Sequence, residues 1–207
     1  MVRPLKLYNH PLAPNPRRVR IFAAEKGIQL ALEDVDILAG QSRTPEFLAK
    51  NSSGAVPVLE LDDGSYLSES VAICRYLEGF QPEPNLMGRD LCEQAEIERW
   101  NRRMELELFN PIARTAQNTN PIFQRRFKQF PEYGEAQRAV AYQRLERMDQ
   151  ELGGHEFVAA NRFTIADITA VVAIDIGGFL ANIQIPPKFA HLTRWHATVS
   201  KRASAKA

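Results

Sequence analysis

Hydrophobic and polar residues alternate in short runs over the first 80 residues of this 207-residue chain, and between the runs lie helical patterns. The alternation predicts strands at 5–8, 28–37, 57–61 and 66–67. Asn15-Pro16 and Thr44-Pro45 combine a cap residue with a proline at the first helical position, so both predict helix starts, with Asn15 as an N-cap. A third helix is expected at 71–77. The order β-α-β-α-β-β-α indicates a small α/β domain with a mixed sheet.

The pattern changes after residue 80. Gln81–Asn85 is a polar run with two prolines, which predicts a linker. Beyond it apolar residues recur at helical spacing, with a long helix expected at 93–115 and Trp100 and Trp195 expected in the core. Thr164–Asp167 predicts a capping box at the start of another helix. We therefore expect domains at 1–80 and 91–207, joined by a linker at 81–90, with the second domain all-helical.

Composition excludes several classes of protein. Lysine and arginine number 26 against 25 for aspartate and glutamate, so no electrostatic attraction to nucleic acid or a membrane surface is expected. Cys74 and Cys92 are far apart, and the four histidines lack metal-ligand spacing, so neither a disulfide nor a metal site is predicted. The N-terminus lacks the apolar core of an export signal, which favours a cytoplasmic protein.

Two neighbouring stretches predict a peptide-binding site. A cis bond at Val56-Pro57 turns the backbone N–H and C=O of Val56 outward, where an extended peptide can pair with them. Ser68-Glu69-Ser70 precedes a helical pattern, so free N–H groups there favour a carboxylate, while Glu69 accepts from an ammonium group. Alternatively, Ser68 simply caps that helix. The expected ligand therefore carries a peptide backbone, a carboxylate and an amine close together. The γ-glutamyl and cysteinyl parts of glutathione have these three groups.

The whole chain resembles the cytosolic glutathione S-transferase family. The matching segments, in order, are Leu7-Tyr8, Asn15 to Arg20, Glu25 to Ile28, Thr44 to Phe47, Asn51 to Leu59, Leu67 to Ile73 and Phe163 to Asp167. The resemblance implies a thioredoxin-like N-terminal α/β domain followed by an all-α C-terminal domain. It also implies that Val56-Pro57 is a cis-proline that pairs with the cysteinyl backbone of glutathione and that Glu69-Ser70 holds the γ-glutamyl end. Gln41 and Ala55 fall where the family contacts the glycyl end or the backbone.

The chain departs from the family at the residue that usually activates the thiol. The resemblance implies that Ala13 and Asn15 also contact glutathione. The alignment puts Ala13 where a serine or threonine is usual, and Ala13 has no hydroxyl. Asn15 remains, and in bacterial members with a Thr-Pro-Asn run, the nu-like type, that asparagine approaches the sulfur. Its amide can donate to a thiolate, while the alternative is that it only caps its helix. Tyr8 is a second candidate activator, or else a packed strand residue, and backbone N–H groups of the loop are a third.

The expected function is a glutathione-dependent transferase, with glutathione as co-substrate and a small electrophile or disulfide as second substrate. Loss of the hydroxyl at Ala13 weakens conjugation more than disulfide exchange, which depends less on a single donor once the thiolate is held. The alternative is a non-catalytic binding or scaffold protein of the same fold. The resemblance implies a homodimer, whereas the identity of the second substrate is left open. Charged residues on the 93–115 helix, including Arg99, Arg102 and Arg103, are read as a solvated, ion-paired face or as part of a substrate or dimer surface.

Overall fold

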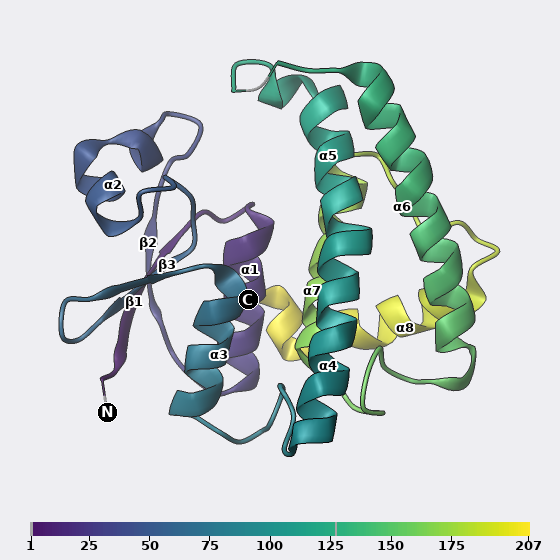
Figure 1. Cartoon of the computed structure of the whole chain (residues 1–207), viewed down its shortest axis with the longest axis horizontal. Helices are drawn as coiled ribbons and strands as arrows, with labels where there is room; N and C mark the ends of the chain where they lie inside the picture. The colour runs from purple at the N-terminus through teal and green to yellow at the C-terminus, as the bar shows by residue number, and fades with distance from the viewer. Residues whose placement is uncertain (1, 127) are drawn as a thin grey trace. The chain divides into compact units, whose positions relative to one another are not determined.

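The computed structural model describes residues 2–126 and 128–207. It divides into two units (Figure 1): the first extends to Leu86 and takes in Ala203–Ala207, and the second is Met87–Arg202. Within the described ranges, no helix combines the length and the apolar character that crossing a membrane requires.

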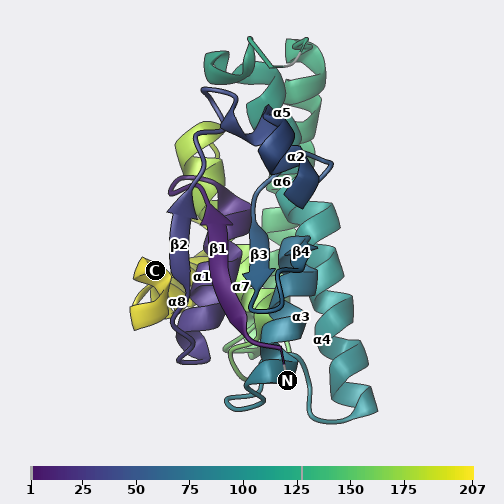
Figure 2. The same ribbon diagram turned by 90° about the vertical axis from the view of Figure 1, so that its left-hand side faces the viewer.

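The first unit is a four-stranded mixed sheet with helices on both faces. Its strands and helices are β1 (Pro4–Asn9), α1 (Pro14–Glu25), β2 (Ala31–Asp34), a 3₁₀ turn (Gln41–Arg43), α2 (Pro45–Lys50), β3 (Val58–Leu61), β4 (Tyr66–Ser68) and α3 (Ser70–Phe80). The strand order is β2-β1-β3-β4, as Figure 2 shows, with β1 parallel to β2 and antiparallel to β3. The predicted order and the mixed sheet are confirmed.

Alternation along the strands divides the core between the two faces of the sheet. Leu7 lies opposite Leu59 and Tyr8 opposite Val58, so successive residues point to opposite faces. On one face Tyr8, Val35, Phe47 of α2 and Val58 form a buried cluster. The helices α1 and α3 pack against each other and bury apolar residues of their own, namely Val19, Ile21, Phe22, Ile73 and Leu77.

Two predicted boundaries of the first unit are wrong. The second strand is only Ala31–Asp34 instead of 28–37, because Asp36 accepts from the N–H groups of Leu38 and Ala39 and turns the chain. The first helix begins at Pro14, with Ala13 at the N-cap position and no side-chain cap, so Asn15 is not the cap. The reason is that Pro14 itself supplies the fixed φ of a first helical residue.

The second unit is all-helical, as predicted. Its α-helices are α4 (Leu91–Arg103), α5 (Asn110–Thr119), α6 (Pro131–Glu151), α7 (Ile165–Leu180) and α8 (Ala190–Ser200), with 3₁₀ turns at Pro121–Phe123 and Leu152–Gly154. A further 3₁₀ turn, Ala203–Lys206, belongs to the first unit. The apolar helix α7 is buried nearly all round between Ile165 and Ile174 and packs against α4, α5 and α8.

The helix expected at 93–115 is longer and is interrupted. A π-helical segment, Met104–Phe109, joins α4 to α5, which continues to Thr119. Pro111 explains the wide turn, because proline has no N–H for the carbonyl four residues earlier and its ring needs extra room there. Trp195 is fully buried as predicted, whereas Trp100 is only half-buried, so its assignment to the core was wrong.

The capping box of α7 is confirmed. The Thr164 side chain accepts from a backbone N–H of the first turn, and the Asp167 carboxylate accepts from the Thr164 N–H at 3.0 Å. Asp167 also accepts from the Val158 N–H at 2.9 Å and the Trp195 indole N–H at 2.8 Å. This fully buried carboxylate therefore ties together the loop before α7, the helix itself and α8.

Candidate functional site

Strand register gathers the predicted site residues at one edge of the sheet. Because β1 and β2 are parallel, both end at that edge, and the antiparallel strand β3 begins there. Val58 pairs with Ser68 at the end of β4, so continuing the same register sets Pro57 beside Glu69. The four segments that leave or enter the sheet here carry Ala13 and Asn15, Gln41, Ala55 to Pro57, and Glu69-Ser70.

The loop before β3 presents the backbone of Val56 with no partner. The Val56-Pro57 peptide bond is cis, as predicted. No hydrogen bond in the described part of the chain uses the N–H or the C=O of Val56. Asn51 orients the preceding peptide by donating its side-chain amide to the Ala55 carbonyl at 2.8 Å. The backbone of Val56 is thus available to pair with an extended peptide.

Gly54 makes this loop possible. Its φ of +60° lies in the left-handed region, and a Cβ placed there meets the Ser42 carbonyl oxygen at 2.7 Å and Arg43 Nη1 at 2.8 Å. Arg43 in turn donates to the Ser53 carbonyl at 3.0 Å. The loop is therefore clamped against the 3₁₀ turn at Gln41–Arg43, and only glycine fits at the point of closest approach.

The start of α3 combines an exposed carboxylate with free backbone donors. Glu69 occupies the N-cap position with φ 68° and ψ 111°, and its side chain makes no capping bond. Ser68 is part of the β4 ladder, so the interpretation of Ser68 as the cap is wrong. A non-glycine residue at positive φ costs of order 1 kcal/mol or more and is typical of functional sites. Here an exposed carboxylate immediately precedes the first N–H groups of α3.

Asn15 and Ser70 are linked through one buried guanidinium. Arg18, 1% exposed, donates through Nη1 to Asn15 Oδ1 at 3.0 Å and to Ser70 Oγ at 2.6 Å. Arginine only donates, so the oxygen of the Asn15 amide must face it and the Nδ2 group points the other way. No described residue accepts from that Nδ2 group. Arg18 thereby fixes which end of Asn15 is offered to a ligand.

Sequence reasoning missed the role of Arg18. Its only signal was a place in the matching run Asn15 to Arg20, since the contact with Ser70 joins residues 52 positions apart. Asn9 was missed as well, and it lies outside the matching segments. Its side chain donates to Asp34 at 2.6 Å and accepts from Arg20, which also donates to the Pro11 carbonyl at 3.1 Å. These contacts fasten the loop between β1 and α1.

The backbone supplies few donors at the start of α1. Pro14 and Pro16 have no N–H, the Ala13 N–H donates to the His10 carbonyl at 3.0 Å and the Arg17 N–H to the Ala13 carbonyl at 3.2 Å. The backbone N–H of Asn15 is the donor that these bonds leave over. Asn15 therefore offers both a backbone and a side-chain donor at the N-terminus of α1.

Tyr8 and Gln41 are engaged within the unit. The Tyr8 ring is 5% exposed, and its hydroxyl donates to Glu60 at 2.8 Å. Burial, followed by this hydrogen bond to the Glu60 carboxylate, raises the pKa of the Tyr8 phenol. Gln41 is exposed and accepts through Oε1 from the Asp36 N–H at 2.7 Å.

Other reactive groups do not join this site. Burial raises the pKa of the Cys74 thiol to about 12, so Cys74 stays protonated at neutral pH. Among residues 2–126 and 128–207, no group of three or more histidine, cysteine, aspartate or glutamate side chains is placed to hold a metal ion. The chemistry of the edge therefore depends on Asn15, Arg18, Val56 and the start of α3.

Comparisons with known proteins agree with this geometry. Residues 13–79 match the glutathione S-transferase N-terminal domain, and residues 111–203 match the glutathione S-transferase C-terminal domain. Glutathione S-transferase 2 of Saccharomyces cerevisiae is 34% identical over all of this chain and 90% of its own length.

Solved structures extend the match to the fold. The crystal structure of Gtt2 from Saccharomyces cerevisiae superposes with a TM-score of 0.91 at 34% identity, covering 98% of each chain. A glutathione S-transferase domain-containing protein of Marinobacter aquaeolei is 37% identical, with a TM-score of 0.88 over 96% of this chain and 98% of that one. The thioredoxin-like fold with an all-helical second domain and the use of glutathione are thereby confirmed, and the chain belongs to the glutathione S-transferase family.

Proposed function

We propose that the edge described above holds glutathione in a defined direction. The cysteinyl backbone pairs with the N–H and C=O of Val56, beside the cis bond to Pro57. The γ-glutamyl carboxylate lies at the first N–H groups of α3 and the Ser70 hydroxyl, and its ammonium group lies at Glu69. Gln41 and Ala55 contact the glycyl end. The observation that carries this proposal is the unpaired Val56 backbone next to Glu69-Ser70 at the same sheet edge.

We propose further that Asn15 activates the thiol. A thiolate is stabilised by hydrogen-bond donors and by the positive end of a helix dipole, and both lower a thiol pKa. Ala13 supplies no hydroxyl, so the donors come from the Asn15 amide, whose orientation Arg18 holds through Oδ1. The Tyr8 hydroxyl is engaged by Glu60, which favours Asn15 over the alternative activator.

The proposed chemistry includes both thiol-disulfide exchange and conjugation. In exchange, the glutathione thiolate attacks one sulfur of a small disulfide, forms a mixed disulfide and releases the other sulfur as a thiolate. In conjugation, the same thiolate attacks an electrophilic carbon and forms a carbon–sulfur bond; with an aryl halide the carbon–halogen bond breaks and halide leaves. A site without a hydroxyl donor at Ala13 favours exchange, which is the behaviour we expect of a nu-like member.

Family membership supports several broader assignments, which we also propose. Residues 1–80 bind glutathione, 81–90 are the linker, and 91–207 contribute the second-substrate site. The protein acts in the cytoplasm as a homodimer.

Calorimetric titration with glutathione tests the binding mode. We expect Ser70→Ala to weaken glutathione about tenfold, because it removes one hydrogen bond to a charged carboxylate. Ser68→Ala, two residues away in β4, is the matched control and should leave the affinity unchanged. Wild-type protein that fails to bind glutathione contradicts the proposal.

Two activity assays separate the reactions. Turnover of a small disulfide faster than that of an aryl halide is the expected result. Faster conjugation of the aryl halide contradicts the preference for exchange. Binding of glutathione with neither activity favours a non-catalytic binding protein instead.

A further inference from the structure

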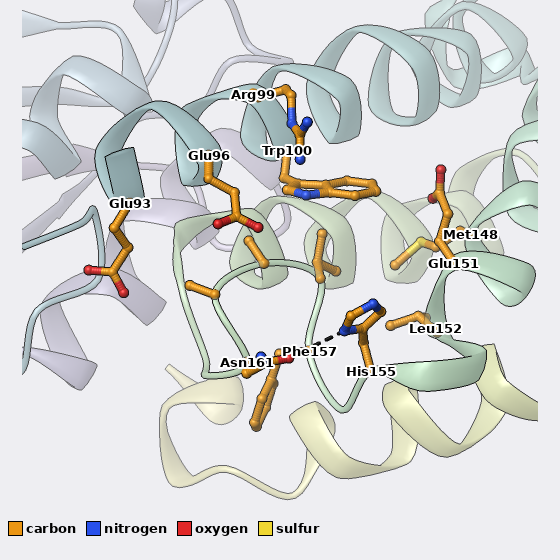
Figure 3. Close-up of a pocket in the computed structure, with 13 residues that line it drawn as sticks. Glu93, Glu96, Arg99, Trp100, Met148, Glu151, Leu152, His155, Phe157 and Asn161 are labelled. Atoms are coloured by element: carbon orange, nitrogen blue, oxygen red, sulfur yellow. Dashed lines mark hydrogen bonds between the residues drawn. The ribbon is translucent and has the colours of Figure 1, made fainter. Parts of the chain in front are cut away.

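A pocket of about 350 Å³ lies wholly within the helical unit (Figure 3). Its walls come from α4, from the end of α6 and the following 3₁₀ turn, and from the loop at 155–161. None of the residues that we assign to glutathione lines it. Its volume is in the range of sites for small organic ligands.

Four buried apolar residues form the floor of the pocket. Met148, Leu152, Val158 and Ala159 line it, and none of them is more than 9% exposed. The Val158 N–H donates to the buried Asp167 carboxylate at 2.9 Å, which fixes the loop that carries two of these residues. An apolar group that enters the pocket therefore leaves water for a surface that is already arranged.

Two exposed side chains of opposite charge lie at the rim of the pocket, one turn apart on α4. Glu96 and Arg99, which we call the rim charges, both line the pocket at a spacing that allows an ion pair on a helix. Their charged atoms are nevertheless more than 4.0 Å apart, and neither forms an ion pair or a hydrogen bond with any residue that the structure describes.

The Trp100 ring accounts for this separation. The Arg99 guanidinium lies 5.5 Å from the centroid of the Trp100 ring, a favourable cation–π distance. Figure 3 shows the Arg99 side chain directed at the indole, whereas the Glu96 carboxylate points into the pocket beside it. The two rim charges are thus held next to each other without neutralising each other by contact.

The other carboxylates of the pocket are compensated. Glu93 pairs with Arg162 at 2.9 Å, and Glu151 pairs with Arg144 at 2.8 Å. The two rim charges then balance, so these groups give no net attraction for either an anion or a cation. A ligand that carries a positive and a negative group close together can pair with both rim charges at once.

We propose that this pocket binds a free α-amino acid with a large apolar side chain. Its ammonium group pairs with Glu96 and its carboxylate with Arg99, while the side chain lies on the apolar floor. The guanidinium keeps its contact with Trp100, because a planar guanidinium can face a ring and still donate from its edge to a carboxylate. The site therefore recognises three features of one small molecule.

Four probes separate these three features. L-phenylalanine carries all of them, whereas phenethylamine lacks the carboxylate, 3-phenylpropionate lacks the ammonium group and glycine lacks the apolar side chain. In calorimetric titration of the full-length protein, L-phenylalanine should bind. Each singly charged analogue should bind at least about threefold more weakly, and glycine about tenfold more weakly. Undetectable binding of L-phenylalanine, or an analogue that binds as tightly as L-phenylalanine, overturns the proposal.

Two substitutions show which rim charge meets which end of the ligand. Glu96→Gln should weaken L-phenylalanine about threefold, the size expected of one exposed ion pair, and should leave 3-phenylpropionate bound no more weakly, since that probe has no ammonium group. Arg99→Gln should weaken L-phenylalanine to a similar extent and leave phenethylamine bound no more weakly. Affinity for L-phenylalanine that survives both substitutions overturns the assignment.

Three control variants locate the amino acid in this pocket. Glu132→Gln in the first turn of α6 and Lys201→Gln at the end of α8 make the same changes of charge outside the pocket. Ser70→Ala tests the glutathione edge, because the γ-glutamyl end of glutathione is itself an α-amino acid group. All three should leave the affinity for L-phenylalanine unchanged, and thermal melts confirm that each variant folds. A fall in any control as large as in the rim variants overturns the proposal.

Discussion

Arg18 links two of the segments at the sheet edge to which we assign glutathione. Its guanidinium joins α1 to the start of α3 by donating to Asn15 Oδ1 and Ser70 Oγ. We infer that it is a positioning residue, since it acts on glutathione through these two side chains. Its burial makes the contact rigid and makes its replacement costly, because two acceptors then lose a charged donor.

Arg18→Met should raise KM for glutathione about tenfold and lower kcat, with a loss of about 1–3 kcal/mol in the free energy of unfolding. Arg18→Lys should recover part of the affinity, because an ammonium group can still donate to both acceptors. Steady-state kinetics and denaturant unfolding measure these effects. Arg17→Met is the neighbouring control. It also removes one guanidinium from α1, but that guanidinium donates to the Ala205 carbonyl and not to Asn15 or Ser70. A purely structural role predicts lost stability in Arg18→Met with unchanged KM and pH profile.

Tyr8 allows the competing activator to be tested by a single substitution. Its hydroxyl donates to Glu60, and burial keeps the phenol protonated. Tyr8→Phe should therefore leave kcat within about twofold, while the free energy of unfolding falls by about 1 kcal/mol because the Glu60 carboxylate loses a donor. A large fall in kcat with unchanged stability would identify Tyr8 as the activator.

At the scale of helices and strands, sequence patterns predicted those features that residues close together in the chain determine. Thr164 and Asp167 are three residues apart, so their capping box was visible in the pattern, as was the cis bond at Pro57 from its place before the third strand. The start of α1 was misplaced because Asn15-Pro16 combines a favourable cap residue with proline, whereas Ala13-Pro14, where the helix actually begins, offers only the proline.

Contacts between distant segments escaped prediction. Arg18 and Ser70 meet only because α1 and α3 pack together, and no periodicity of either helix indicates that pairing. Trp100 has the spacing of a core residue, but the loop at 155–161 leaves a pocket in front of it. Burial of an individual side chain depends on which loop covers it, which the spacing of apolar residues does not specify.

The loop before β3 gives a prediction with an internal control. Gly54→Ala should destabilise the protein by about 2 kcal/mol or more and weaken glutathione binding, because the new Cβ meets backbone and the φ is positive. Gly64, with φ +83°, has open space around its Cβ position, so Gly64→Ala should cost only about 1 kcal/mol. Thermal unfolding with and without glutathione compares the two. Equal costs would mean that the clamp against Ser42 and Arg43 is unimportant.

The start of α7 predicts a pH dependence of stability. Burial, outweighing hydrogen bonds from Val158, Trp195 and Thr164, raises the pKa of Asp167 from 3.8 to about 6. The folded state then holds a proton that the unfolded state has released, so the contribution of this group is complete below pH 3.8 and is lost as the pH rises through 6. Between these two pKa values the protein loses about 1.4 kcal/mol of stability for each rise of one in pH.

Asp167→Asn tests the sign of this effect. The variant should be less stable than wild type, because an amide donor faces the Thr164 N–H, and the difference between them should shrink by a few kcal/mol from pH 4 to pH 7. Chemical denaturation at both pH values measures it. A difference that widens with rising pH would show that the hydrogen bonds outweigh burial and lower the pKa of Asp167.

Across the whole chain, the two units have separate roles. The first unit contains every residue that we assign to glutathione, whereas the pocket beside Trp100 belongs to the second. Family membership establishes the fold and the use of glutathione. Because Ala13 lacks the hydroxyl that usually activates the thiol, another group of this chain must activate it. The mechanism that we propose is the activation of the glutathione thiol by Asn15.

The pKa of the thiol of bound glutathione is the most direct test. Ultraviolet absorbance of the thiolate, followed against pH in saturated wild-type protein, should show a pKa at least about one unit below that of free glutathione. Asn15→Ala should move the pKa back toward the free value, and Asn15→Asp, which places a negative charge beside the sulfur, should raise it further. An unchanged thiol pKa in Asn15→Ala would contradict the assignment of Asn15 as the activator.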